Sequence, residues 1–206
     1  MLKKLLVLLG LATASAATHS GTKPTLDIAV NYAAINETAN LFIDSFGPNF
    51  TSTPRGHIQT DIAGAGAMAG LVLLRNTVPD LDSMSPGTVV ISDVHDGQKE
   101  LLGFMGRVAG NMGLDGNSGW ADPVPSADQP MIDTLELTRR LEVPFRRACE
   151  QTKLPKEYHA HAAALTAMKL VSAGEKMQLL DQKTGKALAF YYLVAGSKTV
   201  PQPIGR

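Results

Sequence analysis

The chain has 206 residues, with 19 Lys and Arg against 19 Asp and Glu, so its formal net charge is zero. No run of like charge exceeds two residues and no aromatic residues alternate with the arginines, which argues against a nucleic-acid-binding protein. The single cysteine, Cys149, excludes an internal disulfide, and we expect it to be buried. The length fits one globular domain.

The first sixteen residues, MLKKLLVLLGLATASA, are typical of a secretory signal peptide. Two lysines precede an apolar stretch over residues 5–11, and Ala14-Ser15-Ala16 is a small-x-small cleavage pattern. The apolar stretch is much shorter than the roughly 20 residues of a membrane-spanning helix. We therefore expect cleavage near Ala16, a periplasmic or secreted mature chain without a transmembrane segment, and a flexible segment over residues 17–24.

The charge is unevenly distributed along the expected mature chain. Residues 17–133 carry five Lys or Arg and thirteen Asp or Glu, a net of −8, whereas residues 134–206 carry twelve and six, a net of +6. Such asymmetry favours docking of the two parts on each other, or contact with an anionic partner.

Two helices are predicted after the expected cleavage site. Over residues 25–46, apolar side chains recur at steps of three and four and form one stripe: Ile28, Tyr32, Ile35, Ala39, Phe42 and Phe46. Gly47-Pro48 is expected to end this helix, with a loop over 48–56. Thr53-Pro54 can then begin a second helix that reaches Arg75. Because residues 62–74 are all apolar or glycine, we expect this helix at the centre of the domain.

The middle of the chain is expected to hold one further helix and a long loop. Residues 88–92 fit either a short strand or the approach to a helix over 96–113. The inward stripe of that helix comprises Leu101, Met105, Val108 and Met112. Residues 113–130 are rich in Gly and Pro and contain the only Trp, so they predict a long surface loop.

The last third is also expected to be helical. Pro125-Ser126 can start a helix to Glu142, after which Pro144 either kinks it or begins another to Lys153. Residues 157–173 form an Ala-rich helix ended by Gly174. Residues 177–194 fit a small β-hairpin around Gly185 or a final helix, and we favour the helix. The predicted fold is a mostly α, single-domain bundle of five to seven helices over residues 25–198, with a flexible tail over 199–206.

Glycines recur at a spacing of four in two of the expected helices. Gly66 and Gly70 lie in the second helix, and Gly106 and Gly110 lie in the third. Glycine inside a helix costs about 1 kcal/mol relative to alanine, so we expect these positions to allow close packing of helix on helix. Residues 64–70 also match a dinucleotide-binding glycine pattern, but no apolar strand precedes them, so no nucleotide cofactor is expected.

The segment VVISDVHDG, residues 89–97, carries the sharpest local motif. An apolar strand ending in Asp93-x-His95 resembles the first motif of the calcineurin-like metallophosphoesterases. That resemblance implies a two-metal centre in which Asp93 and His95 are ligands and a metal-bound water attacks a phosphoester. Gly110-Asn111 and His159-x-His161 are similar to two later motifs of that family. Met112 departs from it, because the family places a catalytic histidine there.

A second metal hypothesis uses the remaining histidines. His57 and Asp61 are four residues apart, which can place both on one helical face, and a bundle can bring His161 to them in its interior. His159 is expected to point away from the core and His161 toward it. The alternative is a hydrogen-bonded core histidine with a surface ion pair. A metal site needs at least three converging ligands, and spacing along the sequence does not show convergence, so a divalent metal stays a secondary hypothesis.

The arginine pairs Arg139-Arg140 and Arg146-Arg147 can bind an anionic group, although pairing with Glu136, Glu142 or Glu150 is the favoured interpretation. No serine or cysteine nucleophile has a recognisable catalytic partner. The sequence therefore favours an exported binding or structural protein that acts alone, as a homo-oligomer or with a protein partner. A metal-dependent hydrolase and a helical bundle that holds a metal or small ligand are the alternatives.

Overall fold

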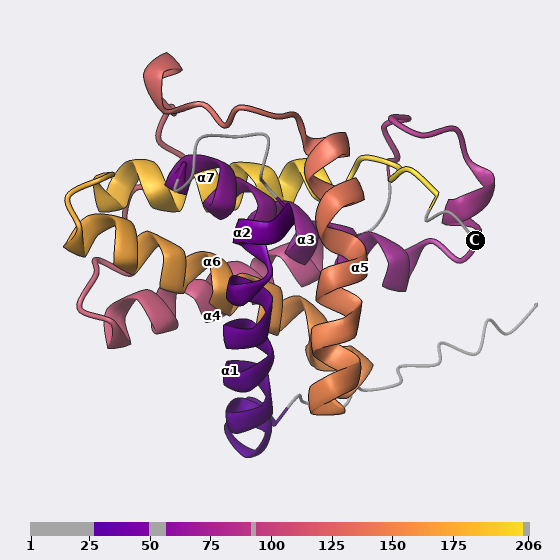
Figure 1. Cartoon of the computed structure of the whole chain (residues 1–206), viewed down its shortest axis with the longest axis horizontal. Helices are drawn as coiled ribbons and strands as arrows, with labels where there is room; N and C mark the ends of the chain where they lie inside the picture. Colours follow the sequence, from indigo (N-terminus) through magenta and orange to yellow (C-terminus); the bar gives the residue numbers. More distant parts are fainter. Residues whose placement is uncertain (1–26, 50–56, 92–93, 204–206) are drawn as a thin grey trace, which may run out of the picture.

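The computed structural model describes residues 27–49, 57–91 and 94–203. These residues form seven α-helices: α1 (Ile28–Asp44), α2 (Phe46–Asn49), α3 (Ile58–Thr77), α4 (His95–Asn111), α5 (Thr134–Thr152), α6 (His159–Lys176) and α7 (Gln182–Gly196). Helices α6 and α7 run across the view of Figure 1, and α1 and α5 run roughly perpendicular to them. The predicted class, a mostly α single-domain bundle, is confirmed.

The central position expected for the second helix is confirmed. Helix α3 packs against α5, α6 and α7, and its residues from Ile62 to Leu71 are all buried. The helix begins later than predicted, at Ile58, where His57 rather than Thr53 is the N-cap. The expected cap at Thr53-Pro54 lies outside the described residues. No helix in the described part of the chain is long and apolar enough to cross a bilayer.

Helices α3 and α7 approach each other through glycine. A Cβ atom on Gly66 would meet the carbonyl oxygen of Ala189, and one on Gly70 would meet the carbonyl oxygen of Leu193, both closer than any van der Waals contact. Because the contacts advance by four residues on each helix, the two helices run in the same direction. The helix-on-helix prediction is confirmed for this pair. In α4, by contrast, Gly106 faces the backbone of Gly116 in the following loop, and Gly110 has open space.

Helix α1 buries most of the predicted stripe against α5 and α6. Ile35, Ala39 and Phe42 are fully buried, and the Phe42 ring lies 4.8 Å from the Phe145 ring on α5. Tyr32 is an exception, with 42% of its surface exposed, whereas Ile28, one turn earlier, is partly buried against the core. The helix ends at Asp44, and Gly47-Pro48 lies within the short turn α2.

The start predicted for the helix around Pro144 was wrong, whereas its end at Thr152 agrees with the predicted Lys153 to one residue. Residues 126–128 form only a 3₁₀ turn, and α5 starts at Thr134, where the Asp133 carboxylate accepts a hydrogen bond from the Glu136 N–H at 2.9 Å. Pro144 lies inside α5 without ending it. One lost backbone hydrogen bond is tolerated there because the neighbouring Leu141 and Phe145 are buried in the core.

The C-terminal region is helical, as favoured, and not a hairpin. Helix α6 continues through Gly174 to Lys176, and α7 follows from an N-cap at Asp181. Residues 88–91 form neither a regular strand nor a helix, since Val89 makes a single β-bridge to Thr199. The Val200 N–H donates to the Thr88 carbonyl at 2.9 Å, and Val200 is buried. Thr199 and Val200, at the start of the tail expected to be flexible, are therefore held along residues 87–90.

Candidate functional site

A pocket of about 750 Å³ opens beside the C-terminal half of α3. Its other walls come from α5, from the 3₁₀ turn η1 (Leu81–Ser83), from the start of α6 and from Pro203 in the C-terminal segment. Three segments that are remote in sequence, residues 68–82, residues 142–159 and Pro203, thus enclose one space. Its volume lies in the range of small-molecule sites, about 300–1,000 Å³.

The inner surface of this pocket is apolar. Met68, Leu71 and Phe145 line it and are at most 1% exposed, and Val72 and Pro203 complete the surface. Met68 and Leu71 lie on the wholly apolar part of α3, and Phe145 continues the inward stripe of α5. An apolar ligand group of matching size would be removed from water on this surface.

A buried ion pair forms one wall. Arg75 Nε lies 2.7 Å from Glu142 Oε1, and Arg75 Nη2 donates to Glu142 Oε2 at 3.1 Å. Arg75 Nη1 also donates to Asp82 Oδ1 at 2.9 Å. Glu142 is only 3% exposed, and this burial raises the pKa of its carboxyl despite the opposing effect of the Arg75 guanidinium. The pair places a rigid, polar surface next to the apolar one.

The mouth of the pocket carries charged side chains that are exposed to solvent. Arg146 and Glu150 lie on α5 and Lys156 precedes α6, and all three line the pocket. Within the described residues, neither Arg146 nor Lys156 has a carboxylate within 4.0 Å. His159 Nε2 lies 2.9 Å from the Leu154 carbonyl oxygen, which fixes the ring at the wall. The mouth therefore holds two cations that can reach an incoming group.

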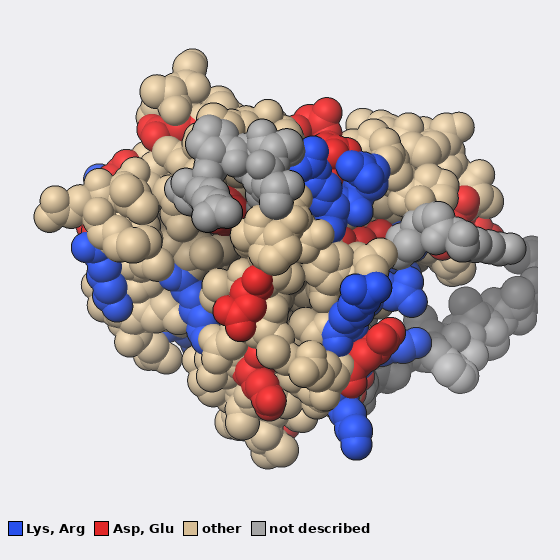
Figure 2. Space-filling model, viewed as in Figure 1, with Lys and Arg blue, Asp and Glu red and all other residues tan. Residues whose placement is uncertain are grey.

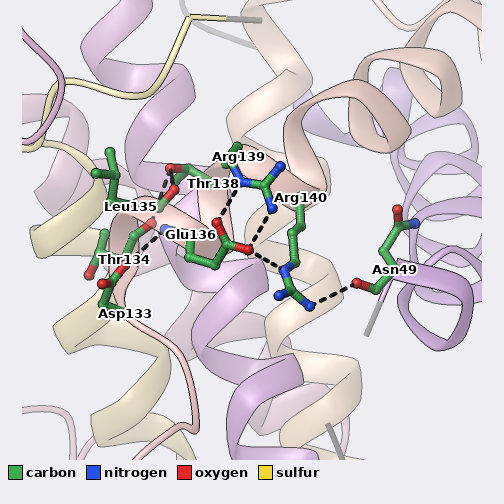
Figure 3. A network of polar contacts seen from close by, with 8 residues as sticks. All are labelled: Asn49, Asp133, Thr134, Leu135, Glu136, Thr138, Arg139 and Arg140. Atoms are coloured by element: carbon green, nitrogen blue, oxygen red, sulfur yellow. Dashed lines mark hydrogen bonds and ion pairs between the residues drawn. The ribbon is translucent and has the colours of Figure 1, made fainter. Parts of the chain in front are cut away.

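Two of the four arginines of α5 are paired within that helix. Arg139 and Arg140 both donate to Glu136, at 2.5–2.6 Å, as Figure 3 shows. Hydrogen bonds from Arg139, and then from Arg140, hold the pKa of Glu136 at about 2, although partial burial opposes them. The favoured prediction of pairing is thus confirmed for these two. Lys and Arg side chains gather on the side of Figure 2 where α5 lies, with Asp and Glu between them.

The metal candidates His57, Asp61 and His161 do not meet in the structure. His57 is the N-cap of α3, and its Nδ1 lies 2.8 Å from Thr60 Oγ1, so its ring serves the helix end. Ile58 contacts Gly174 near the end of α6, whereas His161 is thirteen residues earlier on that helix, a rise of about 20 Å. His57 and Asp61 are therefore remote from His161. Burial raises the pKa of Asp61 to about 6.

His161 faces the core, as expected. It is 3% exposed, its ring centroid lies 5.0 Å from that of Phe104, and its Nε2 lies 3.6 Å from Glu100 Oε1. Burial lowers the pKa of the imidazole, and the Glu100 carboxylate opposes that effect. His159 was predicted to point away from the core. It is half-buried at the wall of the pocket.

The residues of the phosphoesterase-like motif are also spread apart where they are described. Asp93 lies outside the described residues. His95 begins α4 and Asn111 ends it, so the helix separates them by about 24 Å, and both are exposed. His161 lies beside the middle of that helix. Among the described residues no group of three His, Cys, Asp or Glu side chains is placed to hold a metal ion.

Comparison with known proteins gives no relative: no family model matches the chain, and neither a curated protein nor a solved structure matches it.

The sequence did not single out Arg75, Asp82 or Glu142 as site residues. One signal was present, because Glu142 continues the spacing of Thr138, Phe145 and Cys149 and so falls on the buried face of α5. A carboxylate on a buried face needs a cationic partner, but its position some 67 residues after Arg75 gave no indication of which one.

Proposed function

We propose that this protein is an exported binding protein whose pocket between α3 and α5 holds a small amphipathic molecule with an anionic group. The observation that carries the proposal is the joining of an apolar wall with two exposed cations at one mouth. Val72 and Pro203 offer accessible apolar surface over the buried Met68, Leu71 and Phe145, and Arg146 and Lys156 offer the cations.

The distribution of charge favours this orientation of the ligand. At the inner wall, Arg75 already contacts Glu142 and Asp82, so its charge is compensated within the protein. Among the described residues, three carboxylates line the pocket; Glu142 and the exposed Asp82 are paired with Arg75, so Glu150 alone remains beside Arg146 and Lys156 at the mouth. A ligand would therefore place its apolar part inside and its carboxylate, sulfonate or phosphate outside, where it gains charge-assisted hydrogen bonds.

Two fluorescent probes test the proposal. 8-Anilino-1-naphthalenesulfonate is an anionic amphiphile, and N-phenyl-1-naphthylamine is its uncharged counterpart. We expect both to bind the folded protein and the anionic probe to bind more tightly. Replacing Arg146 and Lys156 together by Gln should weaken only the anionic probe, by about tenfold. Arg147→Gln, on the same helix but outside the pocket, is the matched control.

Val72→Trp fills the pocket from α3 and should abolish binding of both probes while circular dichroism and the melting temperature stay close to wild type. Unchanged binding of both probes to this variant would show that the pocket is not the site. Export is tested separately by sequencing the N-terminus of the processed protein, which should start at Ala17. A full-length chain recovered only from the cytoplasmic fraction would contradict that part of the proposal.

A further inference from the structure

A second cavity, of about 480 Å³, lies against α7. It is on the face of α7 opposite to Ala189 and Leu193, which contact α3. Its inner wall is one face of α7, formed by Ala187, Phe190, Tyr191 and Val194 at helical spacing. Its outer wall is part of the long loop that precedes α5, from Trp120 to Gln129. This loop is drawn over α7 in Figure 1.

The loop is fixed on α7 by specific contacts. Lys186 is fully buried, donates to the carbonyl oxygen of Asp115, and places its ammonium 5.6 Å from the centroid of the Trp120 ring. The Asp115 N–H donates to Gln182 Oε1 at 2.8 Å. Gly119, at φ +83°, lets the backbone pass against Lys183, where a side chain would be crowded. The cavity is therefore part of the folded structure.

The lining is unusually aromatic and carries a single negative charge. The whole chain has only eleven Trp, Tyr and Phe residues, and three of them, Trp120, Phe190 and Tyr191, line this one cavity. Asp122 is the only charged side chain among the described lining residues. This is the reverse of the first pocket, whose mouth is rich in cations. Aromatic faces and a carboxylate together attract an organic cation.

We propose that this cavity binds a quaternary or fully alkylated ammonium group. The methyl groups of such a cation match an apolar lining, and its diffuse charge is attracted to ring faces. Lys186 already lies near the Trp120 ring, so Tyr191 and Phe190 are the faces that serve the ligand, with Asp122 as its counter-charge. Tyr191, at 61% exposure, lies where a ligand enters. This proposal is independent of the amphiphile pocket.

Trp120 provides the assay, because it is the only Trp in the chain and lines the cavity. Choline and its uncharged isostere 3,3-dimethylbutan-1-ol are titrated while Trp fluorescence is followed. We expect choline to bind at least tenfold more tightly than the alcohol. Equal affinities would show an apolar cavity without cation selection, and no response to either at 50 mM choline would show no site. Both results overturn the proposal.

Variants locate the binding. Tyr191→Leu and Asp122→Asn should each weaken choline binding about five- to tenfold and leave the melting temperature near that of wild type, since both side chains are exposed. Tyr32→Leu, which removes another exposed tyrosine on α1, is the control and should change nothing. Choline binding that survives both test variants would overturn the assignment to this cavity.

The same cation occurs free and in the headgroup of phosphatidylcholine. Co-sedimentation with phosphatidylcholine vesicles, against phosphatidylglycerol vesicles as the control, distinguishes the two sources. Displacement of the vesicles by free choline would assign the headgroup, and choline binding without co-sedimentation would assign a soluble ligand.

Discussion

Gly70→Ala should destabilise the protein strongly, although alanine is the better helix former. Helices α3 and α7 are in backbone contact at this point, and a Cβ atom on Gly70 would overlap the Leu193 carbonyl oxygen and lie 3.0 Å from the carbonyl carbon of Gly196. Backbone atoms cannot move aside as a flexible side chain can. The two helices must separate by about 1 Å to reach ordinary contact, and α3 is also held by α5 and α6.

The magnitude follows from two opposing effects. Overpacking of a rigid core costs about 1–3 kcal/mol and sometimes more, and backbone contact belongs at the upper end. The intrinsic helix propensity of alanine returns about 1 kcal/mol. We therefore expect the free energy of unfolding to fall by about 2 kcal/mol. Urea denaturation followed by far-ultraviolet circular dichroism measures it, and an unchanged m-value would confirm that the folded state stays compact.

Gly103→Ala is the matched control. Gly103 is exposed in the middle of α4, and the nearest atom to an added Cβ is Nη1 of the flexible Arg107 side chain at 3.6 Å. Here only helix propensity acts, so stability should rise by up to about 1 kcal/mol. Changes in the free energy of unfolding that have the same direction and similar size in both variants would refute a backbone clash at Gly70.

Three further predictions concern buried polar or titratable groups. Burial raises the pKa of the Asp61 carboxyl from 3.8 to about 6, so the folded state favours its protonated form. The contribution of this group to the free energy of unfolding is therefore fully present below pH 3.8 and is lost as the pH rises through 6. Asp61→Asn should therefore stabilise the protein by about 1–2 kcal/mol at pH 7 and hardly at pH 4 in urea titrations, and an equal gain at both would contradict this. Glu142→Ala should lower the free energy of unfolding by about 3 kcal/mol, because it leaves Arg75 without its buried partner. In the same urea titrations, the double variant Arg75→Met, Glu142→Leu should have a stability near that of wild type. Equal losses of stability in the two variants would refute the energetic importance of the pair. The Cys149 thiol, 2% exposed with a pKa of about 12, should react with iodoacetamide only after unfolding, as mass spectrometry would show. Rapid labelling of the folded protein would contradict its burial.

The fold was largely accessible to prediction because it depends on local pattern. The 3.6-residue periodicity identified α1, α3 and α4, and an unbroken apolar run identified α3 as the central helix. The start of α5 was misplaced because a proline followed by serine marks a 3₁₀ turn as well as it marks a helix start. Pro144 could not be judged locally, since whether a proline ends a helix depends on the packing around it.

The site was far less predictable, because it depends on contacts between remote segments. The histidine hypotheses used spacing along the chain, but His57 became a helix cap and His161 a core residue next to Phe104. The pairing of Arg75 with Glu142 and the position of Pro203 at the pocket wall follow only from how the helices pack. Local sequence carries no information about either.

The contact between α3 and α7 also affects when the chain can fold. Gly66 and Ala189 are 123 residues apart, so this close helix contact forms between two segments that are synthesised at well-separated times. Until α7 is present, the apolar glycine face of α3 has nothing to cover it, and the partial chain should stay loosely packed. For the exported protein proposed above, such a delay would keep the nascent chain unfolded enough for translocation until α7 has been synthesised.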